Sequence, residues 1–507
     1  AKDWKYIGKG AKRLDAAAKT NGTAKFGIDM QFSGMKTAVV AHAPVFGGKV
    51  KSFSSAEALK VPGVRKVVQI PTGVAVIADH FWAARQGRNA LKIVWDDGIG
   101  ANLNTGTQVA KYKKLAATNG VEVSKKGNVA TAFSQSVETV EGEFVFPYLA
   151  HAPMEPLNCT VRINGDTCDI WTGTQLPGVD QASAAKILGM KPESINIITP
   201  FLGGGFGRRA TPTSDFVSEA VHIAKASGEF IKMLWTREDD MKGGYYRPLF
   251  IHNVKAGIGK DGYPNAWQHN IAGQSIIAGT PFENPKAKFD DSSVEGVKNS
   301  PYLETIDNHF IGLHSPKEVI PVLWYRSVGN THTAYAMEVM IDQLAHAAKK
   351  DPVEYRRALL KNAPRHLAAL NLVAEKSGWN KKLPEGHYRG VAVHESFSSY
   401  VAQVVEISME NEKPKIHKVT CAIDCGLAVN PDGVVAQMEG GIVFGITMAL
   451  YGELTLKNGQ LQQNNFYDYK IARMHEAPAI EVHIVQGGEK MGGVGEPGVP
   501  PTAPALA

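Results

Sequence analysis

A strand, a glycine-rich loop and a helix follow one another without interruption between residues 195 and 228. The strand-like run "SINIITP" leads into "FLGGGFGRR", and the helix behind it has Thr211 as a cap, Pro212 in its first turn and Gly228 at its end. The loop contains glycines at positions 203, 204, 205 and 207. Glycines leave backbone N–H groups accessible, which suits an anionic ligand at the start of a helix. The segment is therefore either a cofactor cradle or a tight turn that lets strand and helix pack closely.

A dinucleotide-binding loop is one alternative, and the glycine spacing argues against it. With Gly203 and Gly205 as the first two glycines of G-x-G-x-x-G, the third position holds Arg208. The third glycine of that fingerprint allows close packing of helix and strand. A nicotinamide-dependent dehydrogenase that uses this loop stays a rival interpretation, and a test for bound nicotinamide would distinguish it.

The length of the chain predicts several domains. It has 507 residues, of which 44% are hydrophobic, and this exceeds one compact core, so we expect two or three domains. Residues 1–130 contain strand-like runs and a short helix, and a polar stretch at 117–128 marks their end. Residues 131–365 contain strands, the glycine loop and two long helices, whereas 366–507 contain two strands and a glycine-interrupted helix. This order predicts an α+β protein.

Charge and hydropathy argue against two classes of protein. The net charge is +6, and no dense run of Lys and Arg alternates with aromatic residues, so we expect no nucleic-acid partner. No apolar run reaches roughly 18 residues, so we expect no membrane span. The N-terminal stretch "AKDWKYIGKG" has no hydrophobic region, so any signal peptide is absent or already removed.

The four cysteines, Cys159, Cys168, Cys421 and Cys425, do not have the spacing of a zinc or iron–sulfur ligand set. We expect buried thiols, although Cys159 and Cys168 flank a turn and could form a disulfide. No H-E-x-x-H motif or histidine cluster occurs. We therefore expect no metal held directly by side chains and no iron–sulfur cluster within this chain.

Several other polar residues stand next to glycines or turns. Each could serve a site or only the local structure, as a turn, a salt bridge, a buried pair or a helix contact. They are Gln175 in "WTGTQLP", Arg326 in "WYRSVGN", His151 and Glu155 in "HAPMEPLN", and Gln437 and Glu439 in "QMEGG". Glu496 in "GGVGEPGVPP" differs from them, because glycines and prolines hold its carboxylate in a stiff turn.

Taken in order, these motifs resemble the molybdenum-binding large subunit of the xanthine oxidase family. The order is HAPMEP, TGTQ, GGGFG, YR before a glycine turn, DCGLAVNPD with QMEGG, and GVGEP. The ending GGGFGRR is most similar to the branch of isoquinoline 1-oxidoreductase and molybdenum aldehyde dehydrogenases. The resemblance implies an α/β hammerhead domain over 1–130, followed by two elongated mixed α+β molybdopterin-binding domains over 131–365 and 366–507, the last one incomplete.

The resemblance also implies a cofactor, molybdopterin cytosine dinucleotide, whose molybdenum carries oxo, sulfido and hydroxo ligands and is held by the pterin. Glu496 would be the catalytic base, within hydrogen-bond reach of the attacking oxygen. Gln175 and the backbone N–H groups of Phe206 and Gly207 would contact the oxygen ligands, and Arg326 would lie in the loop that closes over the metal. The remaining cofactor contacts would come from Gly204, Gly205, Gln437, Gly440 and Gly493.

Two departures from the family pattern narrow this interpretation. Purine-oxidising members carry a glutamate after the glycine loop, and Ala210 stands at the matching position, so xanthine is not the expected substrate. The family's Met-Gly-Gln-Gly loop is missing, because residues 386–406 run straight through its place. We therefore expect an upstream or separate polypeptide to complete the cofactor site.

The predicted function is oxidation of an aldehyde to a carboxylic acid, with water as the oxygen source. Hydroxylation of an N-heterocycle such as isoquinoline is the alternative. Electrons would pass to a small partner subunit with [2Fe-2S] clusters, and a cytochrome c subunit could accept them next. The resemblance suggests a periplasmic location, with the cytoplasm as the alternative. A non-catalytic binding protein on the same scaffold is a further rival, and it would lack molybdenum.

Overall fold

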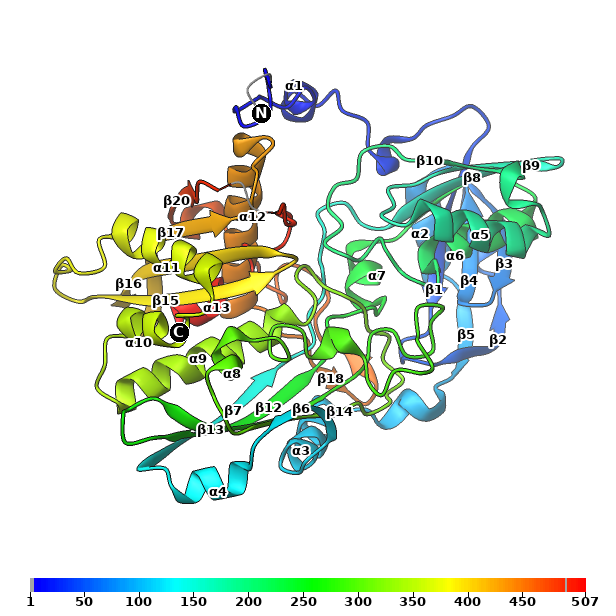
Figure 1. Cartoon of the computed structure of the whole chain (residues 1–507). Coiled ribbons are helices and arrows are strands. Elements are labelled where there is room, and N and C mark those ends of the chain that lie inside the picture. The colour runs from blue at the N-terminus through cyan, green and yellow to red at the C-terminus, as the bar shows by residue number, and fades with distance from the viewer. Residues whose placement is uncertain (1–3, 488–489) are drawn as a thin grey trace.

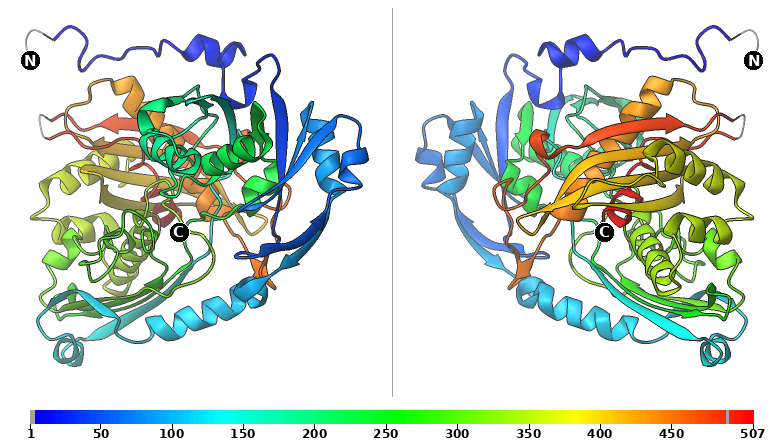
Figure 2. Two further views of the ribbon diagram at one scale, coloured as in Figure 1. Left: turned by 90° about the vertical axis from the view of Figure 1, so that its right-hand side faces the viewer. Right: turned by 90° about the vertical axis from the view of Figure 1, so that its left-hand side faces the viewer.

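The computed structural model describes residues 4–487 and 490–507. Figure 1 shows one part built on the largest sheet and a second part that contains the two other large sheets. The N-terminal segment runs over both parts (Figure 2) and is tied to the second, because the N–H of Gly8 donates to the carbonyl of Val429 at 3.0 Å. The first three residues of the N-terminal stretch discussed above lie outside the described residues.

The largest sheet is mixed and combines strands from both sides of the expected boundary at residue 130. β11 pairs in parallel with β1, with Ile231 opposite Lys36, so the N-terminal region shares a sheet with the region around the glycine loop. The division into domains therefore stays a prediction. In spatial order the strands are β10 (Ile195–Ile198), β9 (Thr167–Trp171), β8 (Asn158–Asn164), β11 (Ile231–Leu234), β1 (Lys36–His42), β4 (Gly73–Ala78) and β3 (Val64–Ile70).

Helix α6 (Asp215–Ser227) covers this sheet and follows the glycine loop. Its predicted apolar face is confirmed, since Phe216, Val217, Ala220, Val221 and Ala224 are all buried. Its predicted end at Gly228 is also confirmed, because this residue has φ +69° and its N–H donates to the carbonyl of Ala224. The predicted start was wrong: Ser214 has φ +51°, which breaks the helical path, so the helix begins at Asp215 rather than at Pro212. Also on this side of the molecule are α2 (Phe81–Asn89), α5 (Pro177–Leu188) and α7 (Arg237–Lys242).

The second sheet includes a strand within the stretch that was expected to be a boundary. Val121–Lys126 forms β6, which pairs antiparallel with β14, with Lys126 opposite His309. In spatial order this sheet contains β6, β14 (His309–His314), β13 (Pro264–Gly273), β12 (Phe250–Ile258) and β7 (Glu138–Phe146). Helices α3 (Thr105–Ala116) and α4 (Val129–Ser134) lie beside it (Figure 1).

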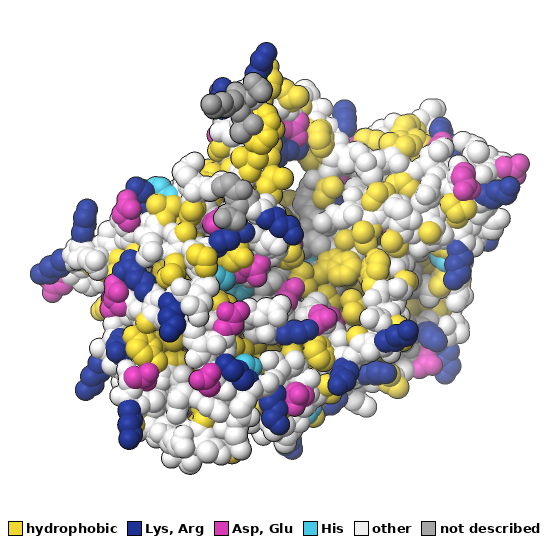
Figure 3. Space-filling model, viewed as in Figure 1, with side chains coloured by type: hydrophobic (Ala, Val, Ile, Leu, Met, Phe, Trp, Pro, Cys, Tyr) yellow, Lys and Arg dark blue, Asp and Glu magenta, His cyan; other side chains and the backbone are white. Residues whose placement is uncertain are grey.

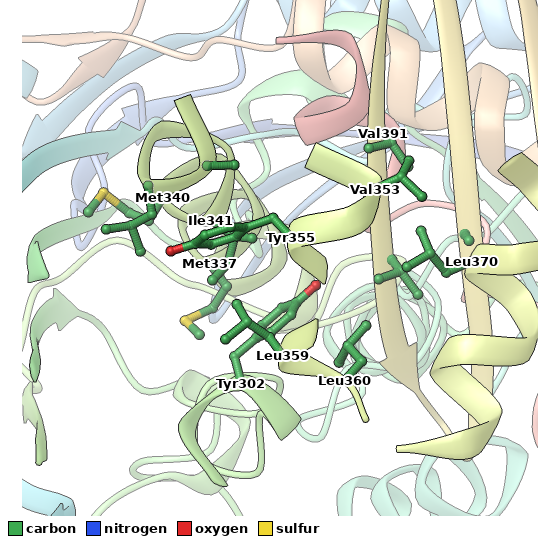
Figure 4. Packing of buried hydrophobic residues seen from close by; sticks show 14 of the residues in the cluster. Tyr302, Met337, Met340, Ile341, Val353, Tyr355, Leu359, Leu360, Leu370 and Val391 are labelled. Carbon is green, nitrogen blue, oxygen red and sulfur yellow. The ribbon is translucent and has the colours of Figure 1, made fainter. Parts of the chain in front are cut away.

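The predicted long helix is α9 (Asn330–Ala347), at the centre of a buried cluster. Figure 4 shows its Met337 and Ile341 close to Tyr302 and Tyr355. Around it lie α8 (Pro301–Glu304), α10 (Pro352–Leu359) and α11 (Pro364–Ser377). Because α9 begins four residues after Arg326, its packing also fixes the turn that carries this arginine.

The third sheet contains β15 (His387–Ser396), β16 (Ser399–Glu410), β17 (Lys413–Asp424) and β20 (Ala479–Ile484). Helix α12 (Pro431–Leu450) packs Val434, Met438, Ile442 and Ile446 against this sheet. By length and composition α12 could cross a membrane, and 33% of its most apolar window is buried. Because a helix packed in a protein core passes the same test and α12 packs against the third sheet, the expectation of no membrane span stays a prediction.

The remaining α-helices and strands are short. They are α1 (Ala16–Thr20), α13 (Thr502–Leu506), the β2 (Lys49–Ser54) and β5 (Lys92–Asp96) pair, and the β18 (Leu456–Lys457) and β19 (Gln460–Leu461) pair.

The four cysteines are free and buried, as expected for core thiols. The alternative disulfide between Cys159 and Cys168 was wrong. In the β8–β9 hairpin Cys168 lies opposite Ile163, so the register keeps Cys159 away from it.

Candidate active site

A cavity of about 750 Å³ lies between the two parts of the molecule, and Figure 3 shows the surface hollowed between them. Segments far apart in the sequence form its wall. The residues expected at the cofactor site that line it are Gln175, Gly205, Phe206, Gly207, Arg326, Gln437, Gly440 and Glu496. The tertiary structure thus brings most of the predicted residues to one place.

Two predicted contacts do not line the wall of this cavity. The carbonyl of Gly204 points behind the loop, where it accepts a bond from Nε of Arg209 at 2.9 Å. The N–H of Gly493 donates to the carbonyl of Phe397 at 2.8 Å, beside a neighbouring loop. A direct cofactor contact by either residue stays a prediction.

The glycine loop turns sharply at the cavity wall. Phe206 has φ +57° and Gly207 has φ +106°, both in the left-handed region. Gln175 supports the turn, because its Oε1 accepts the N–H of Gly207 at 3.2 Å and its own N–H donates to the carbonyl of Arg209 at 2.9 Å. The Nε2 group of Gln175 is then the donor that can face a ligand.

A buried ion pair shapes the same loop from behind. Arg209 and Glu155 lie 3.0 Å apart, and their side chains are 0% and 5% exposed. Arg209 also donates to the carbonyls of Gly204 and Gly173, while Glu155 accepts the N–H of Gly203 at 2.7 Å. Burial lowers the pKa of Arg209, and the charge of Glu155 opposes this. Glu155 is therefore a member of a buried pair, which was one of the two interpretations of this residue. Its partner, Arg209, was missed. The only sequence signal for Arg209 was the pair of arginines directly after the glycine loop.

Arg326 connects two segments of the cavity wall that belong to the second part of the molecule. Its Nε and Nη2 donate to the carbonyl of Gly495 at 2.8 and 2.6 Å, and Nη2 also donates to Oε1 of Gln437 at 3.2 Å. Its guanidinium lies 5.7 Å from the ring centre of Phe444. Arg326 therefore holds the turn that precedes Glu496 against the start of α12.

Glu496 lies at the cavity wall, and Ser327 holds it in place. The N–H of Ser327 donates to Oε1 of Glu496 at 3.2 Å, and the Ser327 hydroxyl donates to the carbonyl of Glu496 at 2.8 Å. Burial raises the pKa of Glu496, while the Ser327 N–H and the charge of Arg326 oppose the rise. A carboxylate with a raised pKa beside a cavity can act as a general base near neutral pH.

Ser327 was missed by the sequence analysis. It has φ +86° and the next residue, Val328, has φ +50°. These values are uncommon for residues other than glycine. No side-chain type predicts the contact with the Glu496 carboxylate, because its donor is a backbone N–H.

The donors at the cavity fit a large cofactor better than a bare ion. Within the described residues, no group of three or more His, Cys, Asp or Glu side chains is arranged to hold a metal. At Gly440 an added Cβ would have Nη1 of Arg326 as its nearest neighbour at 3.9 Å, and at Gly495 it would have Oε1 of Gln437 at 4.0 Å. These glycines keep open space beside the wall, so a planar group that brings its own metal ligands could approach the backbone.

Comparison with known proteins identifies this group. Residues 112–360 and 328–478 match two models of a molybdopterin cofactor-binding domain. The chain is 32% identical over 99% of its length to isoquinoline 1-oxidoreductase subunit beta of Brevundimonas diminuta, of which it covers 66%. It is 28% identical over 98% of its length to a membrane-bound aldehyde dehydrogenase (pyrroloquinoline-quinone) of Gluconacetobacter polyoxogenes, of which it covers 69%.

The fold is similar to that of a solved structure, quinoline 2-oxidoreductase from Pseudomonas putida 86. The TM-score is 0.81 at 15% identity, over 99% of this chain and 94% of that one. This confirms the predicted mixed α+β fold. The glycine loop lies inside the first molybdopterin-binding match, which overturns the nicotinamide alternative. The chain belongs to the molybdopterin-dependent oxidoreductases of the xanthine oxidase family, as a molybdenum-binding large subunit.

Proposed function

We propose that this chain oxidises an aldehyde to a carboxylic acid, with water as the oxygen source. The reaction is RCHO + H₂O → RCOOH + 2H⁺ + 2e⁻. When bound, molybdopterin cytosine dinucleotide supplies the two-electron redox chemistry. The observation that carries the proposal is the carboxylate of Glu496, which lines the cavity opposite the glycine loop and has a raised pKa.

The protein's own residues bind, orient and move a proton. The ionised Glu496 accepts the proton of the attacking oxygen, and the Ser327 N–H fixes the direction of its carboxylate. Nε2 of Gln175 is the donor on the opposite wall, because the N–H of Gly207, which was expected to face the cofactor, donates to Oε1 of Gln175. Arg326 keeps the turn around Glu496 closed, so the base stays in one geometry.

An N-heterocycle is the second candidate substrate. The relative with 32% identity is an isoquinoline 1-oxidoreductase subunit, whereas that with 28% identity is an aldehyde dehydrogenase. The aromatic residues Phe206, Trp324 and Tyr325 line the cavity, and the ring centre of Phe206 lies 4.9 Å from that of Phe444. Such walls suit a planar ring, either as an aromatic aldehyde or as a heterocycle.

The two electrons require partners. We propose a small [2Fe-2S] subunit as the direct acceptor and a cytochrome c subunit as the next one. The relative named subunit beta supports a multisubunit enzyme. The chain spans about two thirds of that relative, which supports an upstream or separate polypeptide that completes the cofactor site.

We also propose a periplasmic location, with the cytoplasm as the alternative; cell fractionation tests it.

The deciding experiment uses the native complex. Its molybdenum, iron and released nucleotide would be measured, and benzaldehyde and isoquinoline would be offered with a dye acceptor in H₂¹⁸O. We expect molybdenum, cytosine nucleotide and ¹⁸O in benzoate. Turnover of isoquinoline alone would move the assignment to the second candidate. A complex without molybdenum would overturn both and favour a binding protein.

A further inference from the structure

A second carboxylate, Glu295, lies behind the turn that holds Glu496. Its Oε1 accepts the N–H of Gly329 at 2.7 Å, and its own carbonyl accepts the hydroxyl of Thr333 at 2.7 Å. Glu295 is therefore attached at two points to the start of α9. The proposed reaction gives this residue no role.

The turn at residues 327–329 is closely packed. A Cβ added at Gly329 would lie 1.9 Å from the carbonyl oxygen of Ser292 and 3.1 Å from Cγ of Glu295. Ser327 and Val328, just before it, have positive φ values of 86° and 50°. Such a backbone persists only when its surroundings enforce it.

Both carboxylates accept N–H groups of this one turn. Ser327 donates to Glu496 on the cavity side, and Gly329, two residues on, donates to Glu295 on the other side. We propose that Glu295 is a positioning residue: its carboxylate holds the Ser327–Gly329 turn in the conformation that presents the Ser327 N–H to Glu496. This inference rests on the proposed role of Glu496 as the base.

The charges around Glu295 support a coupling between the two carboxylates. Burial raises the pKa of Glu295 to about 7, with Glu496 and Asp290 adding to the rise and the N–H groups of Gly329 and Asn330 opposing it. Because the charge of Glu496 raises the pKa of Glu295, removal of that charge should lower it. Glu295 is ionised above about pH 7, where it accepts the Gly329 N–H more strongly.

The two histidines that share a cavity with Glu295 carry no positive charge near neutral pH. A cavity of about 120 Å³ on its far side is also lined by His366, His394, Glu338 and Glu395. Burial lowers the pKa of His366 to about 4 and that of His394 to about 3, so both are neutral near pH 7. Glu338 is paired with Arg356 at 2.9 Å.

The test compares Glu295→Ala with Glu295→Gln in the native complex. Alanine removes the acceptor, so we expect kcat per molybdenum to fall about 10–100-fold with KM within about twofold, since the base loses its orientation. Glutamine keeps an acceptor oxygen, so it should restore most of that loss. Hydrogen exchange at the amides of residues 325–329 should accelerate in the alanine variant and not in the glutamine variant.

Asp351→Ala is the matched control. Asp351 accepts the N–H groups of Val353 and Glu354 at 2.9 and 3.0 Å, and it lies beyond the far end of α9. This variant should lower the melting temperature without changing kcat per molybdenum. If Glu295→Ala behaves in the same way, or keeps kcat within about twofold, the positioning role is overturned.

An infrared titration tests the pair without turnover. Wild type should show a carboxyl group that titrates near pH 7, absent in Glu295→Gln, and its midpoint should move down in Glu496→Gln. If the titration midpoint of Glu295 stays the same in Glu496→Gln, the charge of Glu496 does not act on Glu295 across the turn, and the coupling is overturned. If Glu496→Gln keeps full activity while the midpoint moves, the proposed base is wrong and the coupling stands, so the two failures are distinguishable.

Discussion

The two glycine-bearing loops that face each other across the cavity are held in opposite ways. The loop at residues 203–207 is supported by buried neighbours behind it, above all the pair of Arg209 and Glu155. The terminal loop around Glu496 is held by Arg326 and Ser327, which are 169 positions away in the sequence.

This difference between the two loops predicts that one serves mainly the stability of the fold and the other mainly catalysis. Buried charges must be satisfied in the folded state, so the first loop is bound to the integrity of its sheet. The second loop depends on hydrogen bonds between backbone groups and a few side chains at the cavity. Damage to the first loop should therefore appear mainly as unfolding, and damage to the second mainly as lost turnover.

Glu496→Gln should have the largest effect. Glutamine keeps the size and accepts the Ser327 N–H but cannot take a proton, so kcat should fall about 10²–10⁴-fold. Molybdenum content and melting temperature should stay near those of the wild type. A fully loaded variant with more than about a tenth of the normal kcat, a barrier change below about 1.4 kcal/mol, would refute the base.

Arg209→Ala should destabilise the first part of the molecule. It leaves Glu155 buried without its partner, which typically costs about 3–5 kcal/mol in the free energy of unfolding. Urea unfolding followed by tryptophan fluorescence measures it. The control is Lys60→Ala at the pair with Glu57, whose side chains are 71% and 51% exposed; it should leave stability close to that of the wild type, because solvent screens an exposed pair. Equal effects would contradict the contrast between the loops.

Arg326→Gln should shift the pH profile. The charge of Arg326 stabilises the ionised form of Glu496, so its loss should raise the pKa of the base further. Because the base acts when ionised, the acid limb of kcat/KM should move to higher pH, and kcat should fall about tenfold. Arg162→Gln, at a pair on the first sheet, is the control and should leave the limb in place. A limb that moves down in pH would contradict the assignment.

The smallest effects should come from neighbouring glycines of α12. Gly440→Ala adds a methyl group at the cavity wall and favours the helix, so the chain should gain about 0.5–1 kcal/mol while retaining less cofactor. At Gly441 the added Cβ would lie 3.1 Å from Cα of Gly498, so Gly441→Ala should lower stability. Thermal unfolding and molybdenum content measure both. A loss of stability in both variants would show that Gly440 does not face open space.

Much of the fold could be predicted because it follows from local patterns. Strands β3 and β4, helix α9 and the apolar face of α6 were recognised from periodicity and end signals. The errors fell where distant contacts decide. β6 lies in a polar stretch and is a strand because β14 pairs with it. Helix α6 begins later than predicted because Ser214 has a positive φ, and a serine side chain does not predict this conformation.

The sequence by itself determined the family, because the order of weak motifs is specific, and it singled out Glu496 by its unusual glycine–proline setting. Only the tertiary structure decided how that acid is held. Arg326 and Ser327 hold the turn around Glu496 from 169 positions away, and Glu295, from a third segment, accepts the N–H of Gly329 behind them. The physical reason is that backbone N–H groups are the same in every residue except proline. The direction of an N–H group depends on φ and on contacts between distant segments, and the side-chain types predict neither of them.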